Sequence, residues 1–157
     1  MEKQKIKVNR TSEGTLFEIV FVVLAVIVWA LIIWMLSEAP NVIVTHFDGN
    51  GNPNGYGSPW GLLVPCFITT IAGGALLVAA YHPHLINMPV KINNLRQYEL
   101  AIRSTRIAAL LLLLVTLAIP ATLLTSISPS PWFVIGTVGL LLIDIIVFSV
   151  LIHRARG

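Results

Sequence analysis

The sequence predicts an all-α membrane protein: four transmembrane helices, with a short ordered extracytoplasmic loop between the first two. Hydrophobic residues make up 56% of the 157-residue chain and charged residues only 11%, whereas a soluble domain carries about 25% charged residues. Four apolar runs reach the length of about 20 residues that crosses a hydrocarbon core roughly 30 Å thick. The ten lysines and arginines all lie on one side of the spans that these runs define, as the positive-inside rule requires.

The four apolar runs cover approximately residues 16–36, 61–81, 107–127 and 132–152. Because lipid offers the backbone no hydrogen-bond partners, each run is expected to be helical. We therefore expect a polar cytoplasmic tail, residues 1–15, followed by a single transmembrane domain, residues 16–157. This division leaves no room for a soluble catalytic domain, and we do not expect an enzyme.

The basic residues set the expected orientation. They precede the first span, lie between the second and third spans, or follow the fourth: Lys3, Lys5, Lys7 and Arg10; Lys91, Arg96, Arg103 and Arg106; Arg154 and Arg156. Both termini and the middle loop are therefore expected to be cytoplasmic, in a multipass protein of the cytoplasmic membrane. The net charge of +3 then reflects orientation and attraction to anionic lipid headgroups, so the bilayer, and not nucleic acid, is the expected partner.

The cytoplasmic loop contains a second helical pattern. Ile92, Leu95, Tyr98 and Ile102 recur at helical spacing, with basic residues placed off that stripe. This pattern predicts that residues 91–106 form an amphipathic helix on the inner leaflet that runs into the third span.

Residues 39–60, between the first two spans, form a polar segment without lysine or arginine. The β-prone run 42–47 predicts extended structure, and the glycines, asparagines and prolines that follow as far as Ser58 predict turns. We expect these residues to form an ordered outer cap that binds an extracellular peptide or a partner membrane protein. The residues expected to shape its binding surface are His46, Phe47, Asp48, Gly51, Pro53 and Tyr56.

A metal site in this cap is not expected. Asp48, Asn50 and Asn52 alternate like the first ligands of a calcium loop, but the twelfth residue is Pro59 where such a loop needs an acid. Zinc needs three or four ligands, and the cap supplies His46 alone. We therefore expect no metal and no cofactor.

Asp144 lies near the middle of the fourth span, where insertion of a charged Asp costs about 2.5–3.5 kcal/mol. With no lysine or arginine expected at its depth, Asp144 should be protonated or hydrogen-bonded to hydroxyls across the bundle, such as those of Thr69, Thr70 or Thr116. Two interpretations stay open. Asp144 either serves a small transporter or proton-linked carrier, or holds the helices together.

The outer segment resembles the signature of the DUF1648 family. The residues that carry the resemblance are Pro40, Thr45-His46-Phe47, Gly51, Pro53 and Gly55-Tyr56-Gly57-Ser58. The chain departs from the pattern at Val44, Asn54 and Pro59, where the family usually has proline, aspartate and lysine. The resemblance implies a small membrane domain shared with SdpI-type immunity proteins, which protect a cell from a secreted peptide toxin. It therefore implies a binding, immunity or sensing role, and the departures argue against a charge-dependent ligand.

Overall fold

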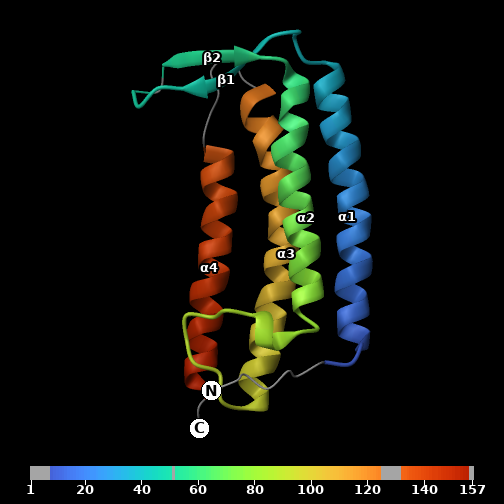
Figure 1. Cartoon of the computed structure of the whole chain (residues 1–157), viewed down its shortest axis with the longest axis vertical. Helices are drawn as coiled ribbons and strands as arrows, with labels where there is room; N and C mark the ends of the chain where they lie inside the picture. Colours follow the sequence, from blue (N-terminus) through green and yellow to red (C-terminus); the bar gives the residue numbers. More distant parts are fainter. Residues whose placement is uncertain (1–7, 51, 125–131, 156–157) are drawn as a thin grey trace.

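Four long helices and one β-hairpin form an elongated bundle in the computed structural model, which describes residues 8–50, 52–124 and 132–155 (Figure 1). The elements are, in order, α1 (Ser12–Ser37), β1 (Ile43–Phe47), β2 (Pro53–Gly57), the 3-10 helix η1 (Pro59–Leu62), α2 (Leu63–Ala79), the 3-10 helix η2 (Pro83–Leu85), α3 (Leu95–Leu124) and α4 (Trp132–Arg154). All four α-helices, α2 together with η1, are long and apolar enough to cross a membrane. The predicted fold class is confirmed, with the addition of the hairpin.

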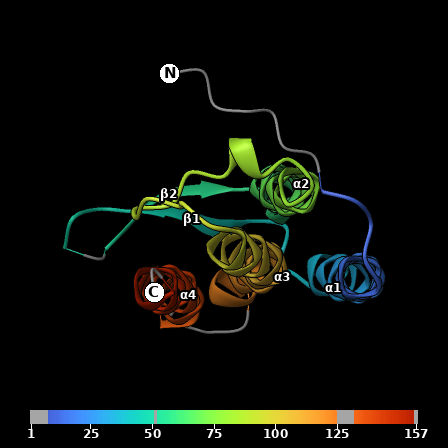
Figure 2. The ribbon, with the colours of Figure 1, turned by 90° about the horizontal axis from the view of Figure 1, so that it is seen from below.

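The bundle is organised around α3. The extensive contacts between helices all involve α3, which packs against α1, α2 and α4. Viewed along the helices, α3 lies between the other three (Figure 2). It is accordingly the most buried of the four candidate spans, and α4 is the least buried because, within the described residues, its extensive helix contacts are with α3.

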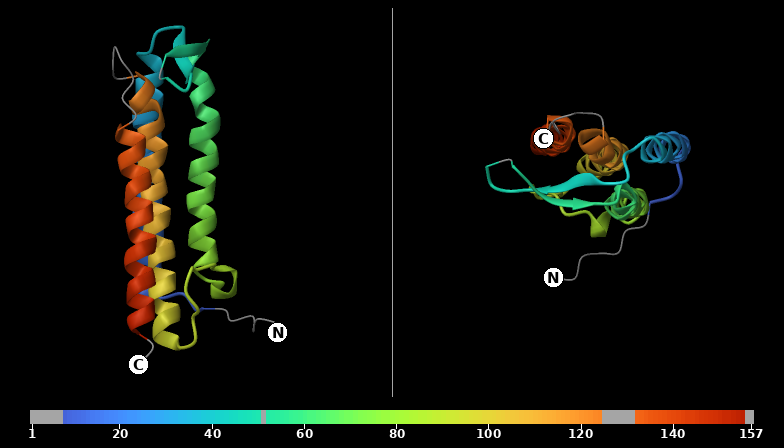
Figure 3. Two further views of the ribbon diagram at one scale, coloured as in Figure 1. Left: turned by 90° about the vertical axis from the view of Figure 1, so that its left-hand side faces the viewer. Right: turned by 90° about the horizontal axis from the view of Figure 1, so that it is seen from above.

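The α3 helix is also the longest element. Its 30 residues correspond to about 45 Å at 1.5 Å per residue, which exceeds a hydrocarbon core of roughly 30 Å. At the end of the bundle away from the hairpin, α3 continues past the end of α2 (Figure 3). We call this the terminal end, because α1 begins there and α4 ends there.

The segment predicted to be an amphipathic helix, residues 91–106, differs in detail from that expectation. Helix α3 begins only at Leu95, and the side chain of Leu95 is 81% exposed. Of the predicted stripe, Ile102 is buried, but the buried face of the first turns also carries Gln97, Ala101 and Ser104. The reason is that α4 packs against this face, where the Gln97 side chain donates a hydrogen bond of 2.8 Å to the Ile152 carbonyl.

Local sequence explains where α1 and α3 begin. The Thr11 hydroxyl accepts a hydrogen bond of 3.1 Å from the Gly14 backbone N–H, as an N-cap does. At the start of α3, Asn94 Oδ1 accepts from the Gln97 backbone N–H at 2.9 Å, and Gln97 Oε1 accepts from the Asn94 N–H at 3.3 Å. This reciprocal pair is a capping box, in which each side chain satisfies a backbone donor that the helix leaves unpaired.

Small residues and hydroxyls allow close packing in the middle of the bundle. The Trp29 indole donates a hydrogen bond of 3.1 Å to the Thr70 hydroxyl, and the Thr69 and Thr116 hydroxyls lie 2.8 Å apart. A Cβ added to Gly73 would lie 2.9 Å from Phe21 Cε2 and 3.1 Å from the Ala109 carbonyl oxygen. Gly73 is therefore required where α1, α2 and α3 meet.

Replacement of Gly73 by alanine is expected to destabilise the bundle by about 1–3 kcal/mol, the usual cost of overpacking a close contact. Thermal unfolding of the purified protein in detergent measures the effect. Gly74→Ala is the matched control, because a Cβ at Gly74 meets nothing within 4 Å. Equal melting temperatures for the two variants would contradict the close packing at Gly73.

Candidate functional site

The hairpin is fixed to the bundle at its base. Ile43, the first residue of β1, is 7% exposed and belongs to the same hydrophobic cluster as Leu36 and Leu62. Viewed along the helices, the two strands cross the end of the bundle and their tip extends beyond it (Figure 3). The base of the hairpin is therefore held by apolar packing, and the rest of it is presented outward.

The second strand was not anticipated by the sequence analysis, which assigned the residues up to Ser58 to turns. Residues 53–57 instead form β2, antiparallel to β1. The paired residues are Ile43 with Gly57, Val44 with Tyr56, His46 with Gly55 and Phe47 with Pro53. Pairing with the β-prone strand β1 explains why residues of low strand propensity become extended here.

The middle of the hairpin is tightly packed. A Cβ added to Gly55 would lie 2.8 Å from the Cβ of His46, its partner across the strands. Next to this contact, His46 Nδ1 forms a hydrogen bond with Asn54 Oδ1. Asn54 stands where the DUF1648 pattern usually has aspartate, so here a neutral amide orients the histidine ring.

Asp48 organises the turn between the strands. Its Oδ1 accepts hydrogen bonds from the backbone N–H groups of Asn50 and Asn52, at 2.9 and 2.8 Å. Its Oδ2 accepts from the Asn52 side chain at 3.2 Å, and its own N–H donates to the Asn52 carbonyl at 2.9 Å. The carboxylate therefore closes the turn on itself, as Asp side chains commonly do.

The six residues predicted to shape the binding surface divide by exposure. The side chain of Tyr56 is 66% exposed, and His46 and Pro53 are also exposed. Phe47 and Asp48 are half-buried, and Gly51 lies outside the described residues. The accessible surface thus consists mainly of His46, Pro53 and Tyr56, with Asp48 in a supporting role.

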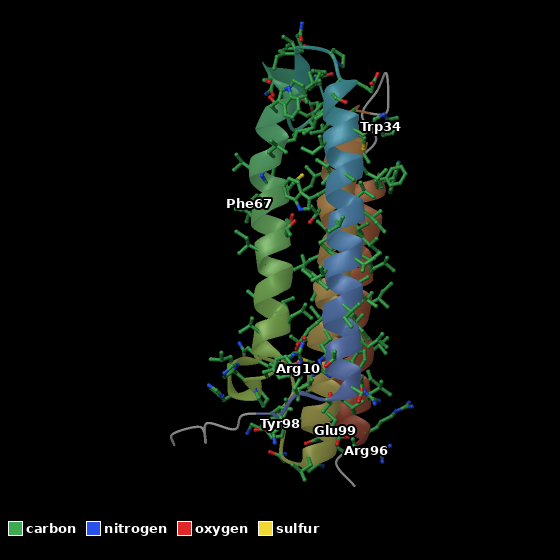
Figure 4. The ribbon with its side chains drawn as sticks, turned by 90° about the vertical axis from the view of Figure 1, so that its right-hand side faces the viewer. Arg10, Trp34, Phe67, Arg96, Tyr98 and Glu99 are labelled. Carbon is green, nitrogen blue, oxygen red and sulfur yellow. The ribbon has the colours of Figure 1, made fainter. Side chains whose placement is uncertain are left out.

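Two tryptophans that the prediction left out lie at the same end of the bundle. Trp60 follows the hairpin in η1 and is 48% exposed, and Trp34 on α1 is 62% exposed (Figure 4). Exposed tryptophans are typical of the interface between lipid and water. Trp34 precedes the hairpin and Trp60 follows it in the sequence, which indicates that both lie near it.

Asp144 is hydrogen-bonded to a hydroxyl, as expected, but the hydroxyl is that of Ser104 and not of one of the three threonines given as examples. It is 7% exposed, and its Oδ2 accepts a hydrogen bond of 2.8 Å from the Ser104 hydroxyl. The predicted threonines lie elsewhere, two of them paired with each other between α2 and α3. Because Ser104 lies between Arg103 and Arg106 in sequence, Asp144 is also closer to the basic end of the bundle than we expected.

A polar cluster at the terminal end was missed by the sequence analysis. The Tyr81 hydroxyl donates a hydrogen bond of 2.6 Å to Glu18 Oε1, and Arg10 forms an ion pair with the same carboxylate. Arg106 is 4% exposed, and its guanidinium carbon lies 5.6 Å from the centroid of the Tyr81 ring. Burial, and then the hydrogen bond to Glu18, raise the pKa of Tyr81 above its usual value. Because these residues are distant in sequence, only the packing of α1, α2 and α3 brings them together.

No group of three or more His, Cys, Asp or Glu side chains gathers as metal ligands would within the described parts of the chain. In the hairpin itself, His46 bonds Asn54 and Asp48 closes the turn. What the hairpin exposes is therefore an aromatic side chain and hydrogen-bonding groups on an ordered support.

Comparison with known proteins identifies one segment. Residues 23–70 match the family model of DUF1648, a domain of unknown function. The match covers most of α1, the whole hairpin and the first part of α2, and so includes all six predicted surface residues. This finding supports the DUF1648 family for that segment. No curated protein and no solved structure matches the chain.

Removal of the Asp48 carboxylate is expected to loosen the hairpin. Asp48→Ala leaves two backbone donors of the turn without their acceptor, and hydrogen bonds to charged groups contribute roughly 1.5–3 kcal/mol. Amide hydrogen exchange over residues 43–57 should therefore become faster by about tenfold or more. Glu38→Ala removes an exposed acid near the same end and should leave this exchange unchanged. If the amides of residues 43–57 exchange equally slowly in both variants, Asp48 does not hold the turn.

Proposed function

We propose that this chain is a binding module of the cytoplasmic membrane, whose hairpin faces the exterior and engages an extracellular peptide or a partner membrane protein. The proposed role is immunity or sensing, exerted by binding and without a catalysed reaction. The observation that carries the proposal is the hairpin itself. It is ordered by its own hydrogen bonds, anchored by Ile43, and presents Tyr56 with most of its side chain exposed.

A preformed surface of this kind favours binding. A rigid loop loses less conformational entropy when it is bound than a flexible one does. Exposed tyrosine and tryptophan are also the side chains most enriched among residues that dominate binding energy. Tyr56 and Trp60 therefore suit contact with a largely uncharged partner surface, because Asp48 is the only charged residue of the hairpin and its oxygens already accept hydrogen bonds.

The proposed orientation rests on charge. The described lysines and arginines lie at or toward the terminal end, away from the hairpin: Arg10, Lys91, Arg96, Arg103, Arg106 and Arg154. The positive-inside rule places such an end in the cytoplasm. The hairpin would then face the exterior, where a secreted peptide can reach it. The resemblance to SdpI-type proteins supports immunity as the outcome of that binding.

Tyr56→Ala is the variant that tests the proposal. Cells that lack the chain are expected to become sensitive to the peptide fraction of their own strain's culture medium, and the wild-type chain should restore growth. An aromatic side chain that dominates binding contributes about 2 kcal/mol or more, so Tyr56→Ala should lower the tolerated concentration by about tenfold or more. Phe133→Ala is the control, since Phe133 is similarly exposed, at 62%, but lies on α4. Equal protection by the two variants at equal membrane levels would refute binding through the hairpin.

A second candidate function, a small proton-linked carrier, rests on Asp144. The observation that favours it is a nearly buried carboxylate whose partner is a hydroxyl, because the ion pairs among the described side chains do not include Asp144. Such intramembrane acids commonly serve proton or ion movement.

Proteoliposomes that contain the purified protein and a pH-sensitive dye test this candidate. If Asp144 carries protons, Asp144→Asn should abolish proton flux, because an amide cannot release a proton at physiological pH. Ser104→Ala keeps the acid and should retain flux. Flux that is unaffected by Asp144→Asn would leave Asp144 with the structural role alone.

A further inference from the structure

A pocket of about 620 Å³ lies at the terminal end. At this end α3 extends past α2 (Figure 3). The lining of the pocket comes from residues 83–93, which connect the two helices, and from Tyr98 on α3. This volume falls within the range of about 300–1,000 Å³ that is typical of small-molecule sites. The pocket lies at the opposite end of the molecule from the hairpin, so an argument about it does not depend on the binding function proposed above.

The walls of this pocket are held by hydrogen bonds. On one side, η2 is closed by bonds from the Leu85 N–H to the His82 carbonyl at 2.8 Å and from the Ile86 N–H to the Pro83 carbonyl at 3.2 Å. On the other side, Gln97 Oε1 accepts from the Asn93 N–H at 2.7 Å, next to the capping box that begins α3. Hydrogen bonds therefore fix both ends of the segment that lines the pocket.

The polar lining residues can donate hydrogen bonds, and none of the lining residues is acidic. Lys91 supplies the permanent positive charge, and Asn87, Asn93 and Tyr98 carry amide or hydroxyl donors. Neither of the ion pairs found within the described residues involves Lys91. Donors around one ammonium group, without a competing carboxylate in the lining, favour an anion with several acceptor oxygens.

The position of the pocket narrows the choice of anion. About 15 Å of α3 exceeds the thickness of the hydrocarbon core, and the pocket lies beside its first turns, where headgroups of the bilayer are expected. The lining also includes apolar side chains, among them Met88 and Ile92. A phosphate group carried by a partly apolar molecule fits both features.

We propose that this pocket binds a phosphate group, carried by an anionic phospholipid headgroup or by a free organic phosphate. Lys91 is the charged contact, and Tyr98 donates from α3. Arg96 provides a sharp comparison, because it lies on the same helix and at the same end as Tyr98 (Figure 4) but is exposed and does not line the pocket. Two residues along a helix place their side chains about 200° apart, so Arg96 and Tyr98 lie on nearly opposite faces of α3.

Binding is measured by titration calorimetry on the full chain in a neutral detergent, with two probes, dioctanoyl phosphatidylglycerol and glycerol 3-phosphate. Lys91→Gln is expected to raise the Kd by about tenfold or more, since hydrogen bonds to charged groups contribute roughly 1.5–3 kcal/mol. Lys91→Arg should restore most of the affinity. Tyr98→Phe should raise the Kd by about threefold to tenfold, and Arg96→Gln should change it by less than about twofold.

The two probes distinguish the sources of the phosphate. If only the lipid binds, the pocket is a headgroup site. If glycerol 3-phosphate binds, with or without the lipid, the pocket recognises the phosphate itself. Either result supports the proposal, provided that the Kd values of the variants change as stated above. Absence of binding for both probes would overturn it. So would an Arg96→Gln effect as large as that of Lys91→Gln, because the interaction would then be a general attraction to a basic surface. Tyr98→Phe keeps the ring and the charge, so it tests the site even if a Lys91 variant fails to fold.

Discussion

Helices in lipid are not driven together by the hydrophobic effect, because lipid tails are as apolar as the side chains they would replace. The bundle therefore depends on close packing and hydrogen bonds along α3, which packs extensively against each of the other helices in the described parts of the chain. Gly73 lets α2 approach the backbone of α3 closely and leaves room for the Phe21 side chain of α1. The bond between Ser104 and Asp144 joins α4 to α3, the only helix against which α4 packs extensively.

The length of α3 shapes the two ends of the molecule differently. At the hairpin end α2 is linked to α1 through the strands, and the cap that results is compact and nearly uncharged. At the terminal end α3 continues beyond α2, and the connecting segment folds against its first turns. Charged residues gather at this end, where Glu18, Tyr81 and Arg106 meet from α1, from the residues after α2, and from α3. The proposed recognition surface at one end and the proposed anion site at the other are consistent with this division of charge.

Several polar residues that first suggest chemistry turn out to support structure. Asp48 resembles the start of a metal loop, yet its oxygens close the turn in which it lies. His46 bonds Asn54 and packs against Gly55. Such groups order the hairpin, and an ordered hairpin would lower the entropic cost of the binding proposed for Tyr56.

The sequence by itself determined the four spans, the clustering of basic charge and the ordered segment between the first two helices. These features follow from composition and local propensity, since about 20 apolar residues must be helical in lipid and the residues around Asp48 form their turn locally. Only the tertiary structure decided that residues 53–57 pair as a strand, that the hydroxyl which meets Asp144 is that of Ser104, and that Glu18, Tyr81 and Arg106 form one cluster. Each of these contacts joins residues from different elements. Which of them meet depends on the register and rotation of packed helices and strands, and a pattern read along one chain segment does not contain that information.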